Sequence, residues 1–336
     1  MTQQVSRKIT GLQFVCAVMI ITLHTAFASY FPGAPQWAVE LNAFWRSLVD
    51  VSISTFFFLT AYLFYRRADE RRYAQVLRQK FFSLVIPYLL WNALYYAYLL
   101  AVEHLTYGTL LNPPDAWEIL RKLTYQTPLD VLWFVRTLLG YVLVFPLIRW
   151  AVNRRWPALV IGAVALMVTA VPQAGVSYYS LTYWLPVYLL GAYTARWHGE
   201  RFERIPQADA WWKYALCAVA ILVLNALRPL HHALHYLFWM PVPLLMWALA
   251  DGFAHAKRLP WWMGTSFYLF LAHLFVQRYA VKLYLLVFGT GTVSFVLGNV
   301  VLPCACAALA LIGAAVMRKV CPRVYAVATG MRPERH

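Results

Sequence analysis

The chain has 336 residues, of which 62% are apolar and only 12% are charged, with 29 Lys and Arg against 13 Asp and Glu. A soluble domain averages about 45–50% apolar and about 25% charged residues. This composition excludes a water-soluble protein of ordinary kind, because too few charged side chains are available to cover its surface. The five cysteines form no C-x-x-C pair, which argues against a zinc site or a disulfide scaffold.

Ten mainly apolar segments follow one another along the chain, and a membrane-crossing helix needs about 20 such residues. They are residues 10–29, 44–65, 81–102, 131–149, 157–172, 178–195, 211–227, 234–250, 262–287 and 293–317. The fifth and sixth are the least distinct, since only the short break at Pro172 to Val176 separates them. We therefore predict an all-α, polytopic integral membrane protein with about ten transmembrane helices, and a single domain over residues 1–336.

The basic residues test this division independently, because cytoplasmic loops of membrane proteins are enriched in Lys and Arg. With ten spans, 22 of the 29 basic residues fall in the loops and termini of one side. Four fall on the other side and three lie inside spans. This alternation predicts that both termini are cytoplasmic, and it explains the net charge of +16 without a nucleic-acid partner.

His24 lies inside the first span, where an ionisable side chain is costly unless it faces a partner or a cavity. Gln13 precedes it by eleven residues, which is about three helical turns and about 16 Å of rise, so both project from one face. The two side chains predict a polar stripe along the first helix. The alternative for His24 is a structural hydrogen bond between helices.

Asp50 in the second span is predicted to lie at a depth similar to that of His24. A carboxylate that accepts from one imidazole nitrogen makes the other nitrogen a better base, so a His24–Asp50 pair would suit catalysis on a hydroxyl group. Two structural alternatives pair Asp50 with Arg46, one turn away, or with Arg136 from the fourth span.

A loop between the second and third spans is strongly basic. It carries Arg66, Arg67, Arg71, Arg72, Arg78 and Lys80. These charges suit a topological signal, and some of them also suit the binding of phosphate groups of a cytoplasmic nucleotide-like donor. Two further groups of residues suggest a role beyond helix packing, because packing alone does not require such residue types. They are Trp133 with Phe134 and Arg136, and His273 in the ninth span. The outer histidines His231, His232 and His235 have a spacing that permits a metal site, although no helper carboxylate lies near them.

Six ordered segments resemble motifs of the membrane-bound acyltransferase-3 family of bacterial surface-glycan O-acyltransferases. The segments are Ile9 to Gln13 with His24 and Thr25; Phe56 to Leu63, like Phe-Phe-x-x-Ser-Gly-Tyr-Leu; Lys80 through Pro87-Tyr88 to Trp91; Leu132-Trp133-Phe134 through Pro146-Leu147; Tyr188 to Tyr193, like its Leu-Gly-Ala-Tyr turn; and Ser266 to His273, like Ser-Phe-x-x-Tyr-x-x-His. Within that family, the pattern is most similar to the enterobacterial-common-antigen O-acetyltransferase type.

Two departures from the family pattern concern its polar residues. Gln13 stands where the family usually has Arg or Lys, and Thr60-Ala61 replaces its Ser-Gly pair. Lys8 is a poor substitute for the missing charge, because five residues of helix place it about 140° away from Gln13. These departures leave open a catalytically impaired family member, and the span count alone also suits an exporter of glycan or lipid intermediates.

The resemblance implies an enzyme that transfers an acyl group, expected to be acetyl, from cytoplasmic acyl-CoA to a hydroxyl of an envelope glycan or lipid-linked sugar. It implies a multi-pass protein of the bacterial inner membrane that holds no permanent cofactor and uses acetyl-CoA as co-substrate. We expect His24 and Asp50 to be catalytic and no metal to be bound. Residues expected on the donor or polar path are Gln13, Arg66, Arg67, Arg71, Arg72, Lys80 and Arg136, with Thr60, Trp133 and His273 as secondary contacts.

Overall fold

The computed structural model describes residues 1–25, 28–66, 72–110, 112–171, 174–206 and 210–331, and these residues contain helices but no strand. The longer helices are α1 (Gln3–Thr25), α2 (Gln36–Val49), α3 (Val51–Tyr65), α4 (Tyr73–Lys80), α5 (Ile86–Tyr107), α7 (Trp133–Leu143), α8 (Phe145–Val152), α9 (Arg155–Ala170), α10 (Leu181–Trp197), α12 (Trp211–Leu227), α14 (Val242–Leu249), α16 (Ser266–Phe288) and α17 (Thr292–Val320). The shorter ones are α6 (Ala116–Arg121), α11 (Gly199–Phe202), α13 (His232–Leu237), α15 (Asp251–His255) and α18 (Pro322–Ala328). The all-α prediction is confirmed.

A helix is present at each of the ten predicted spans, but not all of these helices are equally suited to crossing a membrane. By length and composition, seven described helical segments are long and apolar enough, or eight if α7 and α8, which are bent by 70° to one another, form one span. The 16 residues of α9 and the 17 of α10 are shorter than a usual span. The structure therefore supports a polytopic membrane protein with seven or eight clear spans, fewer than the ten predicted.

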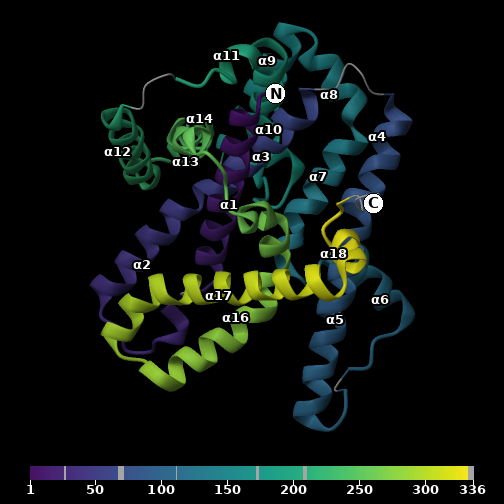
Figure 1. Cartoon of the computed structure of the whole chain (residues 1–336), viewed down its shortest axis with the longest axis vertical. Coiled ribbons are helices and arrows are strands. Elements are labelled where there is room, and N and C mark those ends of the chain that lie inside the picture. The colour runs from purple at the N-terminus through teal and green to yellow at the C-terminus, as the bar shows by residue number, and fades with distance from the viewer. Residues whose placement is uncertain (26–27, 67–71, 111, 172–173, 207–209, 332–336) are drawn as a thin grey trace.

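α1 lies in the middle of the helices, where it contacts α3, α15, α16 and α17 (Figure 1). Its helix is continuous, so Gln13 and His24 keep the spacing that places them on one face. Gly11 permits the close approach of α15, because a Cβ atom at this position would lie 2.3 Å from the ring of Phe253. The first family-like segment is thus also a packing motif.

α10 packs against α3 in the aromatic core. The ring of Phe57 from α3 stacks on that of Trp184 from α10, with centroids 4.9 Å apart. On the neighbouring helix α7, the ring of Tyr141 stacks on that of Tyr188 from α10, with centroids 4.0 Å apart. At Gly191, a Cβ atom would lie only 2.3 Å from the backbone oxygen of Phe58. The segment from Tyr188 to Tyr193, which the motif suggested to be a turn, lies inside α10 and provides this close contact between helices.

Candidate functional site

A cavity of about 320 Å³ opens beside the N-terminal half of α1, which is within the range of small-molecule sites. Three of the predicted site residues line it together: Gln13 from α1, Thr60 from α3 and Lys80 from the end of α4. Phe134 and Phe270 also belong to its wall. The cavity therefore combines an amide, a hydroxyl and an ammonium group with a largely apolar interior.

His24 lies against a second and much smaller space of about 20 Å³. Its other walls are apolar or aromatic and include Ile53 and Trp133, together with the same Phe134 and Phe270 that line the larger cavity. The polar stripe predicted for α1 thus faces two neighbouring spaces: Gln13 borders the larger one and His24 the smaller one.

His273 is fully buried in α16, and its ring lies 5.4 Å from the ring of His24, measured between centroids. Its Nδ1 lies 3.2 Å from the carbonyl oxygen of Leu269 and 2.9 Å from that of Phe270. Since a carbonyl only accepts, Nδ1 must carry the proton, which leaves the lone pair on Nε2. This Nε2 atom is buried, and none of the described residues offers it a hydrogen-bond partner.

α16 also holds the backbone at His24. The side-chain amide of Gln277, one turn after His273, donates a hydrogen bond to the backbone oxygen of His24. Two successive turns of α16 thus position the two histidines side by side. The sequence suggested His273 only as a secondary polar contact, and the structure makes it the immediate neighbour of His24.

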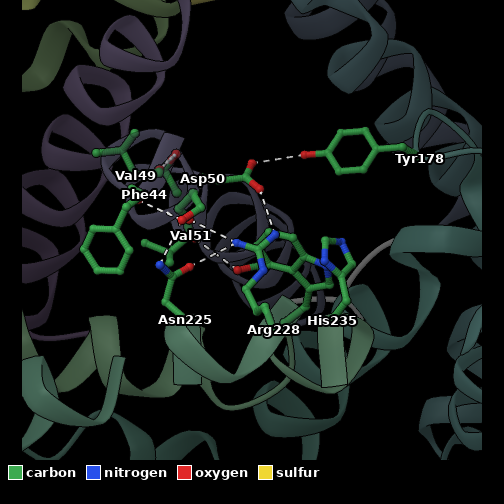
Figure 2. Close-up of polar contacts among 12 residues, drawn as sticks. Phe44, Val49, Asp50, Val51, Tyr178, Asn225, Arg228 and His235 are labelled. Atoms are coloured by element: carbon green, nitrogen blue, oxygen red, sulfur yellow. Dashed lines mark hydrogen bonds and ion pairs between the residues drawn. The ribbon is translucent and has the colours of Figure 1, made fainter. Parts of the chain in front are cut away.

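Asp50 lies between α2 and α3 and is not paired with His24, so the predicted catalytic pair is wrong in its geometry. One carboxylate oxygen of Asp50 lies 3.3 Å from the guanidinium of Arg228, and the other accepts a hydrogen bond of 3.2 Å from the Tyr178 hydroxyl (Figure 2). The alternative of a structural ion pair is therefore correct in type, but the cation paired with Asp50 is Arg228, at the end of α12. Arg46 attracts Asp50 electrostatically, and Arg136 donates to the backbone oxygen of Tyr125.

Arg228 is held from several sides. Its guanidinium donates to the backbone oxygen of Ser47 at 3.0 Å and to the Asn225 side chain at 3.3 Å, and it lies over the rings of Phe238 and Trp239 at 4.5 and 4.4 Å. Figure 2 shows Arg228 and Tyr178 approaching Asp50 from different sides. This network ties together the ends of α2, α3 and α12 and the segment before α10.

The described residues of the basic loop lie in different environments. Arg66 forms an ion pair of 2.8 Å with Glu203, which also accepts a hydrogen bond from Tyr62. Burial raises the pKa of Glu203, but the hydrogen bonds from Arg66 and Tyr62 outweigh burial and lower it below that of an ordinary glutamate. Arg72 is exposed before α4, and only Lys80 of the described part of this loop lines the larger cavity.

Arg67 and Arg71 lie outside the described residues. Arg136 lies over the ring of Tyr125 at 5.2 Å and lines neither cavity. Within the described part of the chain, no group of three His, Cys, Asp or Glu side chains has an arrangement suited to a metal; His231 caps α13 and His235 contacts the Tyr183 hydroxyl.

Sequence reasoning missed a buried charge cluster around Asp251. The carboxylate of Asp251 binds the ammonium groups of both Lys8 and Lys213, and Lys8 is fully buried with its ammonium 3.9 Å from the ring centre of Trp247. Lys8 therefore forms an ion pair with Asp251 at the start of α15, and it does not supply the charge that is missing at Gln13. The available signal was the acidic Asp251 directly after an apolar segment, since such a group needs a partner.

Comparisons with known proteins agree with the motifs. The model of the acyltransferase-3 family, described as an acyltransferase domain, matches residues 7–319. The succinoglycan biosynthesis protein ExoH of Rhizobium meliloti (strain 1021) is 21% identical over 362 residues, covering 99% of this chain and 94% of that protein. No solved structure matches the chain significantly. The chain therefore belongs to the acyltransferase-3 family and is a multi-pass membrane acyltransferase.

Proposed function

We propose that this protein is an O-acyltransferase of the bacterial inner membrane that transfers an acetyl group from cytoplasmic acetyl-CoA to a hydroxyl of an envelope glycan or a lipid-linked sugar. The observation that supports this proposal is that the cavity beside Gln13, Thr60 and Lys80 is lined by two aromatic rings that also line the space at His24. A donor that enters this cavity brings its thioester toward a histidine. A relative named for succinoglycan biosynthesis supports a glycan acceptor.

The charge distribution supports entry of the donor from the cytoplasmic side. Lys80 belongs to the basic loop that the excess of Lys and Arg assigns to the cytoplasm. Its ammonium and the Gln13 amide are donors suited to phosphate or carbonyl oxygens of a CoA ester. Acyl-CoA is made and kept in the cytoplasm of bacteria, so this side suits the donor.

In this mechanism the His24 imidazole accepts the proton of the acceptor hydroxyl while the hydroxyl oxygen attacks the thioester carbonyl carbon. The new C–O bond forms, the C–S bond breaks, and the leaving thiolate takes up the proton, which gives the ester and free CoA. General-base catalysis of this kind contributes about 10²- to 10⁴-fold to the rate. His273 does not touch the donor cavity, and its role is to place and support His24.

The test uses purified protein in liposomes, radiolabelled acetyl-CoA and extracted envelope glycan. His24→Ala is expected to lower acetyl transfer by at least about 100-fold, because the base is lost. The matched control is His104→Ala, at an exposed histidine near the end of α5, which should keep wild-type transfer. Wild-type rates in His24→Ala would remove His24 from the mechanism.

Gln13→Arg tests the donor path and the possibility of an impaired enzyme. A charged donor in place of the amide should raise kcat/KM for acetyl-CoA by about 10-fold, since hydrogen bonds to charged groups are worth about 1.5–3 kcal/mol. Transfer by Gln13→Arg but none by the wild-type protein would identify a family member that has lost activity at this position. An unchanged kcat/KM would remove Gln13 from the donor path.

A further inference from the structure

Two phenylalanine rings separate the larger cavity from the space at His24. Phe134 from α7 and Phe270 from α16 are the two residues that line both spaces. Their rings meet edge to face, with centroids 5.8 Å apart. A group that moves from the larger cavity toward His24 must therefore pass these two rings.

Both rings pack against other aromatic rings. Phe134 lies edge to face against Phe57, with centroids 4.6 Å apart, and contacts Phe56 at 6.0 Å. Phe270 stacks on Phe267 at 6.3 Å and is only 5% exposed. Aromatic pairs in such arrangements are stabilising beyond their buried area. These contacts hold both rings in place between α7, α3 and α16.

The space beyond the rings is very small and almost entirely apolar. Its volume of about 20 Å³ is room for one group of the size of a water molecule or a methyl group. Among the described residues of its wall, His24 is the one ionisable side chain, and the remaining lining is aliphatic or aromatic. A methyl group suits such a site, whereas each further methylene requires room that closely packed walls do not offer.

We propose that Phe134 and Phe270 determine the acyl-chain length of the donor, restricting it to a two-carbon acyl group. The inference rests on the proposed function, in which the donor thioester approaches His24 from the larger cavity. Longer acyl groups remain on the cavity side of the two rings, with their carbonyl carbon out of reach of an acceptor hydroxyl at His24. Phe134 and Phe270 are thus specificity-determining residues that take no part in bond making.

The experiment compares acetyl-CoA with butyryl-CoA as donors for purified protein with extracted envelope glycan. The measured quantity is the ratio of kcat/KM for the two donors. Phe134→Ala and Phe270→Ala should each raise the butyryl-to-acetyl ratio by at least about 10-fold, since a single methylene in an apolar pocket is worth about 10- to 200-fold. Phe134→Leu and Phe270→Leu serve as milder variants and should raise the ratio less.

The control is Leu138→Ala, one turn after Phe134 in α7, which enlarges the larger cavity but does not line the space at His24. Its ratio should stay within about 2-fold of wild type. An unchanged ratio in all Phe134 and Phe270 variants, or a wild-type protein that uses both donors equally well, would overturn the inference while leaving the proposed function intact. Failure of the wild-type protein and of Gln13→Arg to transfer from either donor would overturn both.

Discussion

Individual buried or half-buried charges in this protein pair with residues far away in the sequence. Asp50 pairs with Arg228, Asp251 pairs with Lys8 and Lys213, and Arg66 pairs with Glu203. A charged group without a partner is costly in a low-dielectric interior, so each pair fixes the relative position of two or more helices. Several charged residues that are conspicuous in the sequence therefore have a structural role.

Asp50→Asn distinguishes the structural role of this carboxylate from a catalytic one. The substitution leaves Arg228 buried without its counter-charge, and we expect a loss of about 3 kcal/mol in stability, as for other broken buried pairs. Transfer activity per folded molecule should stay within about 2-fold. Thermal unfolding in detergent and the acetyl-transfer assay measure the two effects.

Glu40→Gln is the matched control, because Glu40 is an exposed acid of α2 that accepts a hydrogen bond from Gln36. Glu40→Gln should change neither the stability nor the transfer activity. A 100-fold lower kcat in Asp50→Asn with unchanged stability would contradict the structural role and return Asp50 to the orientation of His24.

At the scale of whole helices, close approach at small residues organises the molecule around α1 and α3. Such contacts between membrane helices are typically made by small residues, because a side chain would keep the backbones apart. Gly11 admits the ring of Phe253, and Gly191 admits the backbone of α3. Two of the motif segments, those that contain Gly11 and Gly191, thus coincide with close contacts between helices.

Gly191→Ala should destabilise the protein by about 1–3 kcal/mol, the usual cost of overpacking. The added Cβ atom would lie 2.3 Å from the Phe58 backbone oxygen, which cannot rotate away. Gly162→Ala in α9 is the control, since the nearest atom to its Cβ lies 3.8 Å away. Thermal unfolding of both variants checks the difference; equal melting temperatures would show that α3 and α10 separate at no cost.

For the molecule as a whole, the membrane topology depends on the two short helices α9 and α10. If both cross the membrane, the segment around Ser177 lies outside, while Asn153 and Glu200 lie in the cytoplasm. If neither crosses, all three lie on one side. The basic residues favour the first arrangement, because Arg154, Arg155 and Arg196 flank the two helices on one side only.

Cysteine labelling tests this arrangement in a variant whose exposed Cys304 and Cys321 are replaced by Ser. A membrane-impermeant maleimide should label Ser177→Cys in intact spheroplasts, as it should the outer-loop control Thr109→Cys. Asn153→Cys and Glu200→Cys should react only after lysis. Labelling of all positions from the same side would show that α9 and α10 do not cross.

The sequence alone determines the properties that depend on local composition and helical period. Apolar runs predict the membrane helices, and the eleven-residue spacing places Gln13 and His24 on one face, because the rise and twist of a helix are fixed. Six ordered motifs sufficed to predict the family, which the match over residues 7–319 confirms.

Only the tertiary structure decides which helices pack together, and the details of the site depend on this packing. His24 and His273 are 249 residues apart, as their numbers show, and nothing in the period of either helix reveals that their rings meet. The same holds for Asp50, whose partner Arg228 lies at the end of α12, and for Phe134 and Phe270, which together line the larger cavity and the space at His24. Long-range contacts of this kind follow from the shape and charge of whole surfaces, which a linear pattern does not encode.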